Sequence, residues 1–187
     1  TETPAEVSVG ALEAQRLSKL EAIKSRGIDP YPVRFAGKQN IADIRRESFG
    51  ENNDLTPAED AAHVATAGRV VAIRDMGKAQ FLQIQDQSGR VQVYAGNKTL
   101  GEDDYFVLRN LDLGDVLHHE EVNSLDIVGI KGRPFRTKTG EASIHADELK
   151  ILSKNLAPLP VVKEKDGETY DGISDIELRY RQRYRQW

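Results

Sequence analysis

The sequence predicts a mainly β fold, a small five-stranded barrel preceded by helices. Residues 63–155 contain segments in which apolar and polar side chains alternate, separated by turns rich in glycine and polar residues. Such alternation is typical of strands that bury one face. Residues 1–62 instead space their apolar side chains as helices do. The expected order within the barrel is three strands, one helix and two further strands.

The composition fits one such domain with additional segments. The chain has 187 residues, of which 39% are hydrophobic and 30% charged, and its formal net charge is -4. This charge argues against holding a nucleic acid by bulk attraction, but it permits a local site with a few cations. No apolar run is long enough to span a membrane, no signal peptide is visible, and cysteine is absent. We therefore expect a cytoplasmic protein with no membrane segment and no disulfide framework.

The predicted helical N-terminal appendage covers residues 1–62. Its first helix spans residues 11–26 and ends at Gly27. Asn40 can cap a second, shorter helix, and an acidic loop follows over residues 51–62. The apolar side chains expected to face the core from these helices are Leu12, Leu17, Leu20, Ile23, Ile41, Ile44 and Phe49.

The predicted barrel domain covers residues 63–155. Gly68 indicates a bulge or bend in the first strand, and the fifth strand is expected to break near Ala146. This order of elements is that of a Greek-key OB-fold, which binds oligonucleotides on the face of its second and third strands. The five strands are predicted at 63–74, 79–86, 90–94, 127–136 and 141–152, with a helix at 102–111.

Phe81 is the most informative residue because it lies on the polar face of its strand. Leu82 and Ile84 must share the core face with Val91 and Val93 of the next strand, and this requirement fixes the register. A flat ring on the opposite face is a stacking platform for a nucleobase, and neighbouring amides can match the edge of a base. The side chains expected on that outward face are Phe81, Gln83, Gln85, Arg90, Gln92 and Tyr94.

Further charged residues border this face, and each also fits an ordinary surface position. Arg74 can contact a base or a phosphate, or it can be a solvated cation. A carboxylate at Glu141 would lie near a nucleic acid only if it accepted a hydrogen bond from a base N–H. That Glu141 is a solvated turn residue is an equal alternative. Three more cations can follow a nucleic-acid backbone or form a solvated edge, namely Arg133, Arg136 and Lys138.

Neither catalysis nor a metal site is favoured by the sequence. The segment 118–121, His-His-Glu-Glu, places its side chains on adjacent residues and lacks the spacing of helical zinc sites. His63 and His145 have no evident nucleophile partner, and no phosphate-binding glycine loop is present. We expect no catalytic residue, no metal ligand and no cofactor in this chain.

Several motifs together carry a family resemblance. They are residues 70–81, 86–94, 135–141, 152–154 with 158–160, and 179–184. In order and spacing, over about residues 12–184, they resemble the anticodon-binding barrel and following segment of bacterial-type class II lysyl-tRNA synthetases. They favour the lysine enzyme over its aspartyl and asparaginyl relatives, which share the barrel.

The resemblance implies a role for each matching position. The aromatic that matches Phe81 stacks on the central anticodon uridine, and the residues that match Gln92 and Arg74 hydrogen-bond that base. The acid that matches Glu141 helps to read a neighbouring anticodon base. The implied partner is tRNA with a lysine anticodon loop. In the full-length parent, the resemblance implies ATP-dependent charging of tRNA with lysine, ATP and Mg²⁺ as cofactors, and a homodimer.

The chain also departs from the family pattern in two places. Residues 116–126 intervene where relatives pass almost directly to the fourth strand. The family's catalytic motifs are absent, so we expect residues 156–187 to be a linker and the start of a missing catalytic domain, and the chain to be inactive alone. Two other functions stay open: a protein–protein interaction or assembly module built on the barrel, and a sequence-tolerant single-strand binder.

Overall fold

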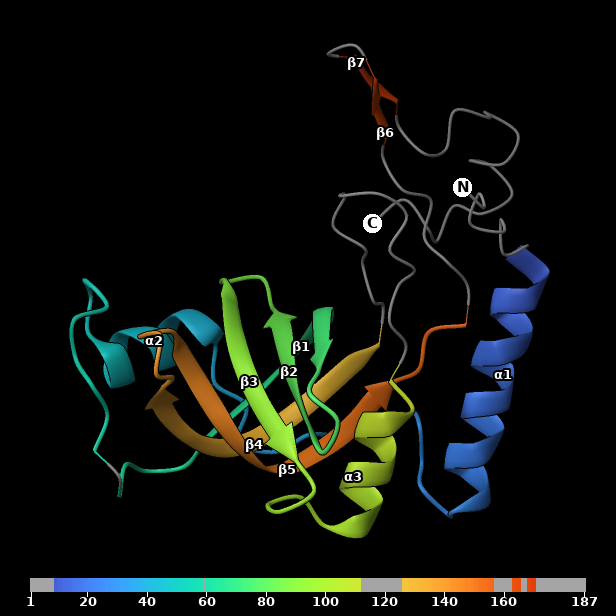
Figure 1. Ribbon diagram of the computed structural model, residues 1–187, viewed down its shortest axis with the longest axis horizontal. Coiled ribbons are helices and arrows are strands. Elements are labelled where there is room, and N and C mark those ends of the chain that lie inside the picture. Colours follow the sequence, from blue (N-terminus) through green and yellow to red (C-terminus); the bar gives the residue numbers. More distant parts are fainter. Residues whose placement is uncertain (1–8, 59, 112–125, 157–162, 166–167, 171–187) are drawn as a thin grey trace. The chain divides into compact units, whose positions relative to one another are not determined.

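The computed structural model describes residues 9–58, 60–111, 126–156, 163–165 and 168–170, with side chains from Glu13 onward in the first helix. Two separate units are present, residues 1–156 and 157–187. The described part of the first unit holds three helices, α1 (Val9–Ser25), α2 (Ile41–Phe49) and α3 (Glu102–Arg109), together with a barrel (Figure 1). The described part of the second unit is an antiparallel pair, β6 (Lys163–Lys165) and β7 (Glu168–Tyr170).

Five strands close into the barrel in the order β1-β2-β3-β5-β4. The only parallel pairing in this barrel joins β3 to β5, and all its other neighbouring strands are antiparallel. The predicted OB-fold barrel with N-terminal helices is therefore confirmed. The strands are β1 (Val64–Asp75), β2 (Ala79–Gln85), β3 (Arg90–Gly96), β4 (Ile127–Arg136) and β5 (Ala142–Ser153).

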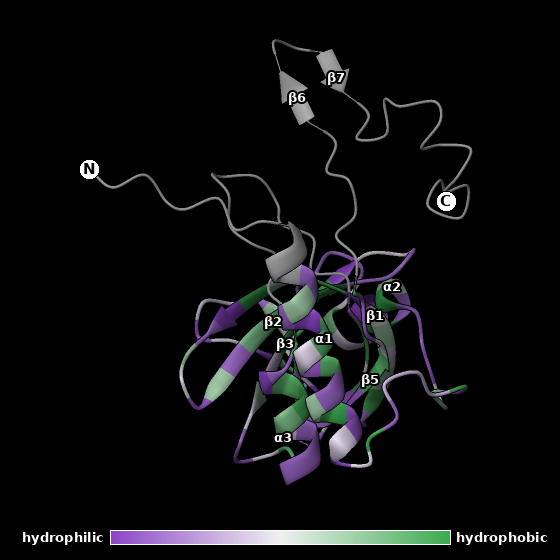
Figure 2. Ribbon diagram, turned by 90° about the vertical axis from the view of Figure 1, so that its right-hand side faces the viewer, coloured by the Kyte–Doolittle hydropathy of each residue, from purple (hydrophilic) through white to green (hydrophobic). Residues whose placement is uncertain are grey.

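The barrel interior is filled by the alternate side chains that were predicted to face inward. Leu82 and Ile84 of β2 and Val91 and Val93 of β3 are at most 2% exposed. Apolar and polar bands alternate along these strands in Figure 2, as burial of one strand face requires. α1 and α3 lie on the same side of the barrel and α2 lies at its other end (Figure 1). The helices add Ile23, Ile41, Ile44, Val107 and Leu108 to the same core.

Strand β1 pairs with β4 through its first half and with β2 through its second half. The bulge predicted at Gly68 lies instead between Val70 and Ala72, where the register with β2 shifts. Gly68 serves a different purpose, because a Cβ there would lie 2.6 Å from the backbone oxygen of Gln85. Glycine is thus required at this position by the close approach of β2.

The irregularity predicted near Ala146 is a bulge within a continuous strand. Gly132 of β4 pairs with Ala146, whereas Lys131 pairs with Glu148, so Asp147 is the extra residue of β5. The strand continues on both sides of this position and keeps Ile144 and Leu149 fully buried.

Helix α1 buries a different stripe from the one predicted. Leu20 and Ile23 are buried, as expected, but Leu17 is 46% exposed and Arg16 is 7% exposed. Residues 16, 20 and 23 follow the helical spacing of one face, and Leu17 lies to the side of that face. The apolar stem of Arg16 can cover core residues as a leucine would. The side chain of Leu12 lies outside the described residues.

Helix α2 is capped by the turn between β2 and β3 and not, as predicted, by Asn40. The side chain of Asn40 makes no capping hydrogen bond. Instead, Asp86 Oδ2 accepts from the backbone N–H of Ile41 at 3.0 Å, and Ser88 Oγ accepts from that of Ala42 at 3.0 Å. These two bonds satisfy helix donors that would otherwise lack partners and attach α2 to the β2–β3 hairpin.

Replacement of Asp86 by asparagine is expected to lower the free energy of unfolding at neutral pH by about 1 kcal/mol, a typical value for loss of a helix cap. Partial burial acts to raise the pKa of Asp86, but hydrogen bonds from the Ser88 hydroxyl and from the backbone N–H groups of Ile41, Ser88 and Gly89 outweigh it, so the pKa is lowered. A carboxyl group with a lowered folded pKa stabilises the fold above its unfolded pKa, about 3.9. That contribution is lost as the pH falls through the folded value.

Urea unfolding of the wild type and of Asp86→Asn at a series of pH values measures this contribution. The difference between the two proteins should be largest near neutral pH and should shrink below about pH 4. Glu47→Gln removes a carboxylate of the same helix that has no bond among the described residues, and it should change little. A difference for Asp86→Asn that stays constant down to acidic pH would contradict the role of the carboxylate.

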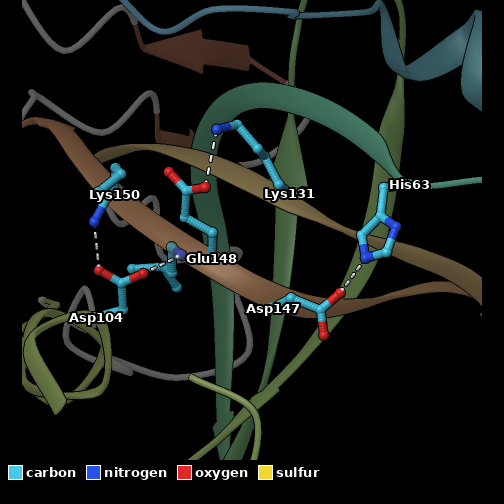
Figure 3. Close-up of polar contacts among 7 residues, drawn as sticks. His63, Asp104, Lys131, Asp147, Glu148 and Lys150 are labelled. Carbon is cyan, nitrogen blue, oxygen red and sulfur yellow. Dashed lines mark hydrogen bonds and ion pairs between the residues drawn. The ribbon is translucent and has the colours of Figure 1, made fainter. Parts of the chain in front are cut away.

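Asp104 joins α3 to β5 (Figure 3). Its Oδ2 accepts from the backbone N–H of Leu149 at 3.1 Å and its Oδ1 from Lys150 Nζ at 2.8 Å. The hydrogen bond to Asp104 raises the pKa of Lys150 above its usual value. The helix ends at Arg109, two residues before the predicted end, and Leu111 beyond it is still buried.

Candidate nucleic-acid interface

The outward faces of β2 and β3 carry side chains directly opposite one another. Phe81 pairs with Tyr94, Gln83 with Gln92, and Gln85 with Arg90. The register predicted from alternation is therefore confirmed, and Phe81 does not point into the core with Leu82.

Phe81 is half-buried because other rings pack beside it. Its ring centroid lies 5.2 Å from that of Tyr94, with 57° between the planes. Tyr94 in turn stacks on His145 at 5.2 Å and 28°, and Phe135 meets His145 edge-on at 5.9 Å. The side chains predicted for this face included Phe81 and Tyr94 but not Phe135 and His145. Their outward positions on β4 and β5 follow from the same alternation that placed Phe81.

A groove of about 520 Å³ lies beside the Phe81 ring. We call it the base groove and define it by four of its lining residues, Arg74 from β1, Phe81 from β2, Gln92 from β3 and Lys138 from the β4–β5 turn. The structure thus brings together three of the four residues proposed for base recognition. The remaining lining residues are Ala72, Ile73, Leu82, Gln83, Thr137 and Thr139.

The amide of Gln92 is held in one orientation by Ser143 beneath it. The hydroxyl of the buried Ser143 donates to the backbone oxygen of Glu141 at 3.3 Å, so its oxygen can accept. Gln92 Nε2 donates to that oxygen at 3.0 Å. Gln92 Oε1 has no hydrogen bond among the described residues, so it can accept one from a ligand in the base groove.

The cations near this face fall into two groups. The side chains of Arg74 and Lys138 are exposed and form no ion pair or hydrogen bond with any described residue. Arg136, in contrast, donates to the backbone oxygens of Asn53, Leu55 and Gly140 at 2.7–2.9 Å. Its guanidinium therefore holds the segment after α2 against the β4–β5 turn.

Arg90 lies at the far end of the same face from Phe81. Its Nε donates to Gln85 Oε1 at 2.8 Å, and its backbone oxygen accepts from Arg45 NH1 at 3.0 Å. Arg90 lines a separate groove between α2 and the β2–β3 turn, outside the base groove.

Glu141 is exposed at the start of β5 and does not line the base groove. Its backbone accepts from the N–H of Thr137 at 3.1 Å and donates to the Thr137 hydroxyl at 3.0 Å. Glu141 thus sits at the base of the turn that carries Lys138.

The β1–β2 turn beside Arg74 is fixed by Asp75. Asp75 Oδ1 accepts from the backbone N–H of Gly77 at 2.7 Å, and Oδ2 accepts from Arg109 NH1 at 2.6 Å. The bond from Gly77 and then that from Arg109 lower the pKa of Asp75. A carboxylate held in this way keeps the end of β1, and with it Arg74, in place.

The described residues contain no group of three or more His, Cys, Asp or Glu side chains placed to hold a metal ion. In the same part of the chain, no helix is long and apolar enough to cross a membrane. The His-His-Glu-Glu segment at 118–121, residues 116–125 of the proposed insertion, and the motifs at 158–160 and 179–184 lie outside the described residues.

A closed five-stranded barrel of this topology, with rings and amides on the face of β2 and β3, defines an OB-fold nucleic-acid-binding domain. Residues 64–152 match the tRNA anti-codon family model, which is described as an OB-fold nucleic acid binding domain.

Almost the whole chain is similar to lysine–tRNA ligases. It is 43% identical over 172 residues to the lysine–tRNA ligase of Azobacteroides pseudotrichonymphae genomovar. CFP2, and this alignment covers 92% of this chain and 32% of the relative. It is 41% identical over 179 residues to the lysine–tRNA ligase of Porphyromonas gingivalis strain W83, and this alignment covers 92% of this chain and 28% of the relative. The chain therefore spans no more than 32% of the length of these curated relatives. The predicted resemblance to lysyl-tRNA synthetases is confirmed.

Proposed function

We propose that the barrel binds the anticodon loop of a tRNA and reads an unpaired uridine in the base groove. The observation that carries this proposal is the convergence of a ring, an amide oxygen and a cation on one groove, from Phe81, Gln92 and Arg74. The amide oxygen and the cation have no hydrogen-bond partner among the described residues. The family match and the similarity to lysine–tRNA ligases support tRNA as the nucleic acid. Single-stranded loop bases are recognised in this way, by stacking on a ring and hydrogen bonding at their edges.

The orientation of Gln92 favours uridine over cytidine. Uracil carries a hydrogen on N3 and can donate it to Gln92 Oε1, whereas N3 of cytosine is an acceptor and would face that oxygen unfavourably. Because Ser143 occupies the amide's nitrogen, turning the amide to suit cytosine would break the 3.0 Å bond. Arg74 supplies donors for a carbonyl oxygen of the base or for a phosphate.

The Gln92→Ala variant is expected to reduce discrimination between uridine and cytidine at the central anticodon position more than it reduces total binding. The reason is that stacking on Phe81 is retained while the contact that distinguishes the two bases is lost. A wild-type preference of about five- to a hundredfold, the effect of one good polar contact, should fall to a few fold in the variant.

Fluorescence anisotropy with two stem-loop RNAs, one with a UUU anticodon and one with a UCU anticodon, measures the total affinity and the discrimination between uridine and cytidine. Gln85→Ala is the matched control, because Gln85 lies on the same outward face but pairs with Arg90 outside the base groove. Equal affinity losses for both RNAs in Gln92→Ala would contradict the assignment. Equal affinity of the wild type for both RNAs would favour a sequence-tolerant binder, and absence of RNA binding would favour a protein interaction module.

We extend this proposal to the full-length protein. The parent of this chain is a cytoplasmic lysyl-tRNA synthetase that charges tRNA with lysine using ATP and Mg²⁺ and acts as a homodimer. In it, residues 1–62 are the helical appendage, 63–155 the anticodon-binding domain and 156–187 the link to the catalytic domain. The similarity to lysine–tRNA ligases over 92% of this chain supports this placement.

A further inference from the structure

The end of strand β1 carries opposite charges on its two faces. Arg74 pairs with Phe81 and lines the base groove, and the next pair along the two strands is Asp75 with Gln80. Because successive side chains of a strand point to opposite faces, Asp75 and Gln80 lie behind this wall of the groove. An exposed cation in the groove therefore has a carboxylate as its immediate neighbour in the chain.

The last residue of helix α3 holds this carboxylate. Arg109 NH1 donates to Asp75 Oδ2 at 2.6 Å, and it lies 3.4 Å from the backbone oxygen of Gly77 in the same turn. Asp75 Oδ1 accepts from the N–H of Gly77 at 2.7 Å, and Gln80 Nε2 is 3.4 Å from Asp75 Oδ2. Both carboxylate oxygens are thus occupied on the side of the β1–β2 turn that faces α3 (Figure 1).

The state of this carboxylate matters for RNA binding because it adjoins Arg74. Arg74 forms no ion pair or hydrogen bond with any described residue, so its guanidinium is available to a ligand in the base groove. Consecutive Cα atoms are about 3.8 Å apart, well within the Debye length of about 8 Å at physiological ionic strength. An uncompensated charge on Asp75 would attract the Arg74 guanidinium and repel the phosphates of an RNA.

We propose that Arg109 is a positioning residue for RNA binding, which keeps Arg74 available to the RNA by holding the Asp75 carboxylate on the side of α3. Arg109 does not line the base groove, and it acts through Asp75 rather than on the RNA. Its bonds also hold the β1–β2 turn in one conformation, so less ordering is required when RNA binds. This role rests on the proposed function of the base groove and adds to it a residue from outside the barrel strands.

The test measures the affinity of the full chain for a stem-loop RNA with a UUU anticodon by fluorescence anisotropy. Arg109→Met should weaken binding about two- to tenfold, an effect typical of neighbours that act through one network. Lys131→Met is the matched control and should leave affinity unchanged. It removes the cation of an ion pair of similar exposure, away from the base groove. Partly exposed pairs contribute little to stability, so both variants should fold, which circular dichroism checks.

Two double variants decide how Arg109 acts. Asp75→Asn, Arg109→Met lacks the carboxylate, but the asparagine oxygen can still accept from the N–H of Gly77. Its affinity should therefore return to within about twofold of the wild type, the usual error of additivity. In an Arg74→Met background, Arg109→Met should have no further effect beyond the same margin of about twofold, because the cation that it keeps available is already absent.

Each other result overturns this role. If Asp75→Asn, Arg109→Met binds as weakly as Arg109→Met, Arg109 contacts the RNA itself or only stabilises the fold. If the losses from Arg74→Met and Arg109→Met multiply, the two residues act independently, and if Arg109→Met binds as the wild type does, Arg109 has no role in binding. If Arg74→Met has no effect while Phe81→Ala weakens binding, the role of Arg109 is refuted and the base groove stands. If the wild type does not bind RNA, the proposed function fails and the role of Arg109 fails with it.

Discussion

Replacement of Lys154 by methionine is expected to lower the free energy of unfolding by about 3–5 kcal/mol, the usual result of removing one partner of a buried ion pair. Lys154 Nζ lies 2.7 Å from Asp126 Oδ2, and the two side chains are 0% and 1% exposed. The same ammonium donates to the backbone oxygen of Asn110 at 3.3 Å, and Asp126 Oδ1 accepts from the N–H of Asn155 at 2.9 Å. Without Lys154, the Asp126 carboxylate would lose its ion-pair partner in the protein interior.

Urea or thermal unfolding followed by far-UV circular dichroism measures this loss, which corresponds to roughly 6–20 °C in the melting temperature of a chain of this size. Lys131→Met is the matched control, because Lys131 forms an ion pair of 2.9 Å with Glu148 that is 40% and 34% exposed (Figure 3). Such a pair contributes at most about 1 kcal/mol. The double variant Asp126→Asn, Lys154→Met should recover most of the stability, since neither charge of this buried pair remains. Equal effects of the two single lysine variants would contradict the role given to burial.

The strands of the barrel could be predicted from the sequence because their signal is local. Period-two alternation of Leu82, Ile84, Val91 and Val93 defines the buried face, and a one-residue slip would turn all of these side chains toward water. The same rule fixes the outward pairs, including Phe81 with Tyr94. The register of β2 and β3 therefore needed no information from outside the hairpin.

The contacts that the sequence did not predict join residues far apart in the chain. Asp86 caps a helix that begins 45 residues earlier, Arg136 binds a carbonyl 83 residues earlier, and Lys154 pairs with a residue 28 positions away. The residue type alone allows each of these side chains several roles at the protein surface. Only the closure of the barrel, which brings the β2–β3 turn to α2 and the β4–β5 turn to the segment after α2, decides among them.

For the candidate site, the alternation of polar and apolar residues predicted which side chains lie on the β2–β3 face, but it did not predict the groove beside Phe81. The β4–β5 turn with Lys138 forms one wall of the base groove, and Ser143 of β5 fixes the orientation of the Gln92 side chain. Neither relation can be seen in the hairpin sequence. The packing of His145 on Tyr94 likewise depends on the parallel β3–β5 pairing, which spans 51 residues between Tyr94 and His145.

The Phe81→Ala variant is expected to weaken binding of an anticodon stem-loop by about 1–3 kcal/mol, or roughly 5- to 150-fold, the range for loss of one base–aromatic stack. The fold should be retained, because Phe81 is half-buried on the outer face of β2 and the core below it is formed by Leu82 and Ile84. Phe81→Leu keeps the apolar bulk but not the flat ring, so it should bind nearly as weakly as Phe81→Ala. Full affinity in Phe81→Leu would show that apolar contact, and not stacking, is what the base requires.

The salt dependence of binding separates the ring from the cations of the same groove. Stacking involves no counterion release, so Phe81→Ala should lower affinity by the same factor at every salt concentration. Lys138→Gln removes an exposed ammonium from the wall of the base groove. If that group contacts a phosphate, the slope of log affinity against log salt should become shallower by about 0.7, the value for one contact to a single strand. A change of slope in Phe81→Ala would mean that the ring positions a phosphate contact, and the assignment of Phe81 as the surface on which the base stacks would have to be abandoned.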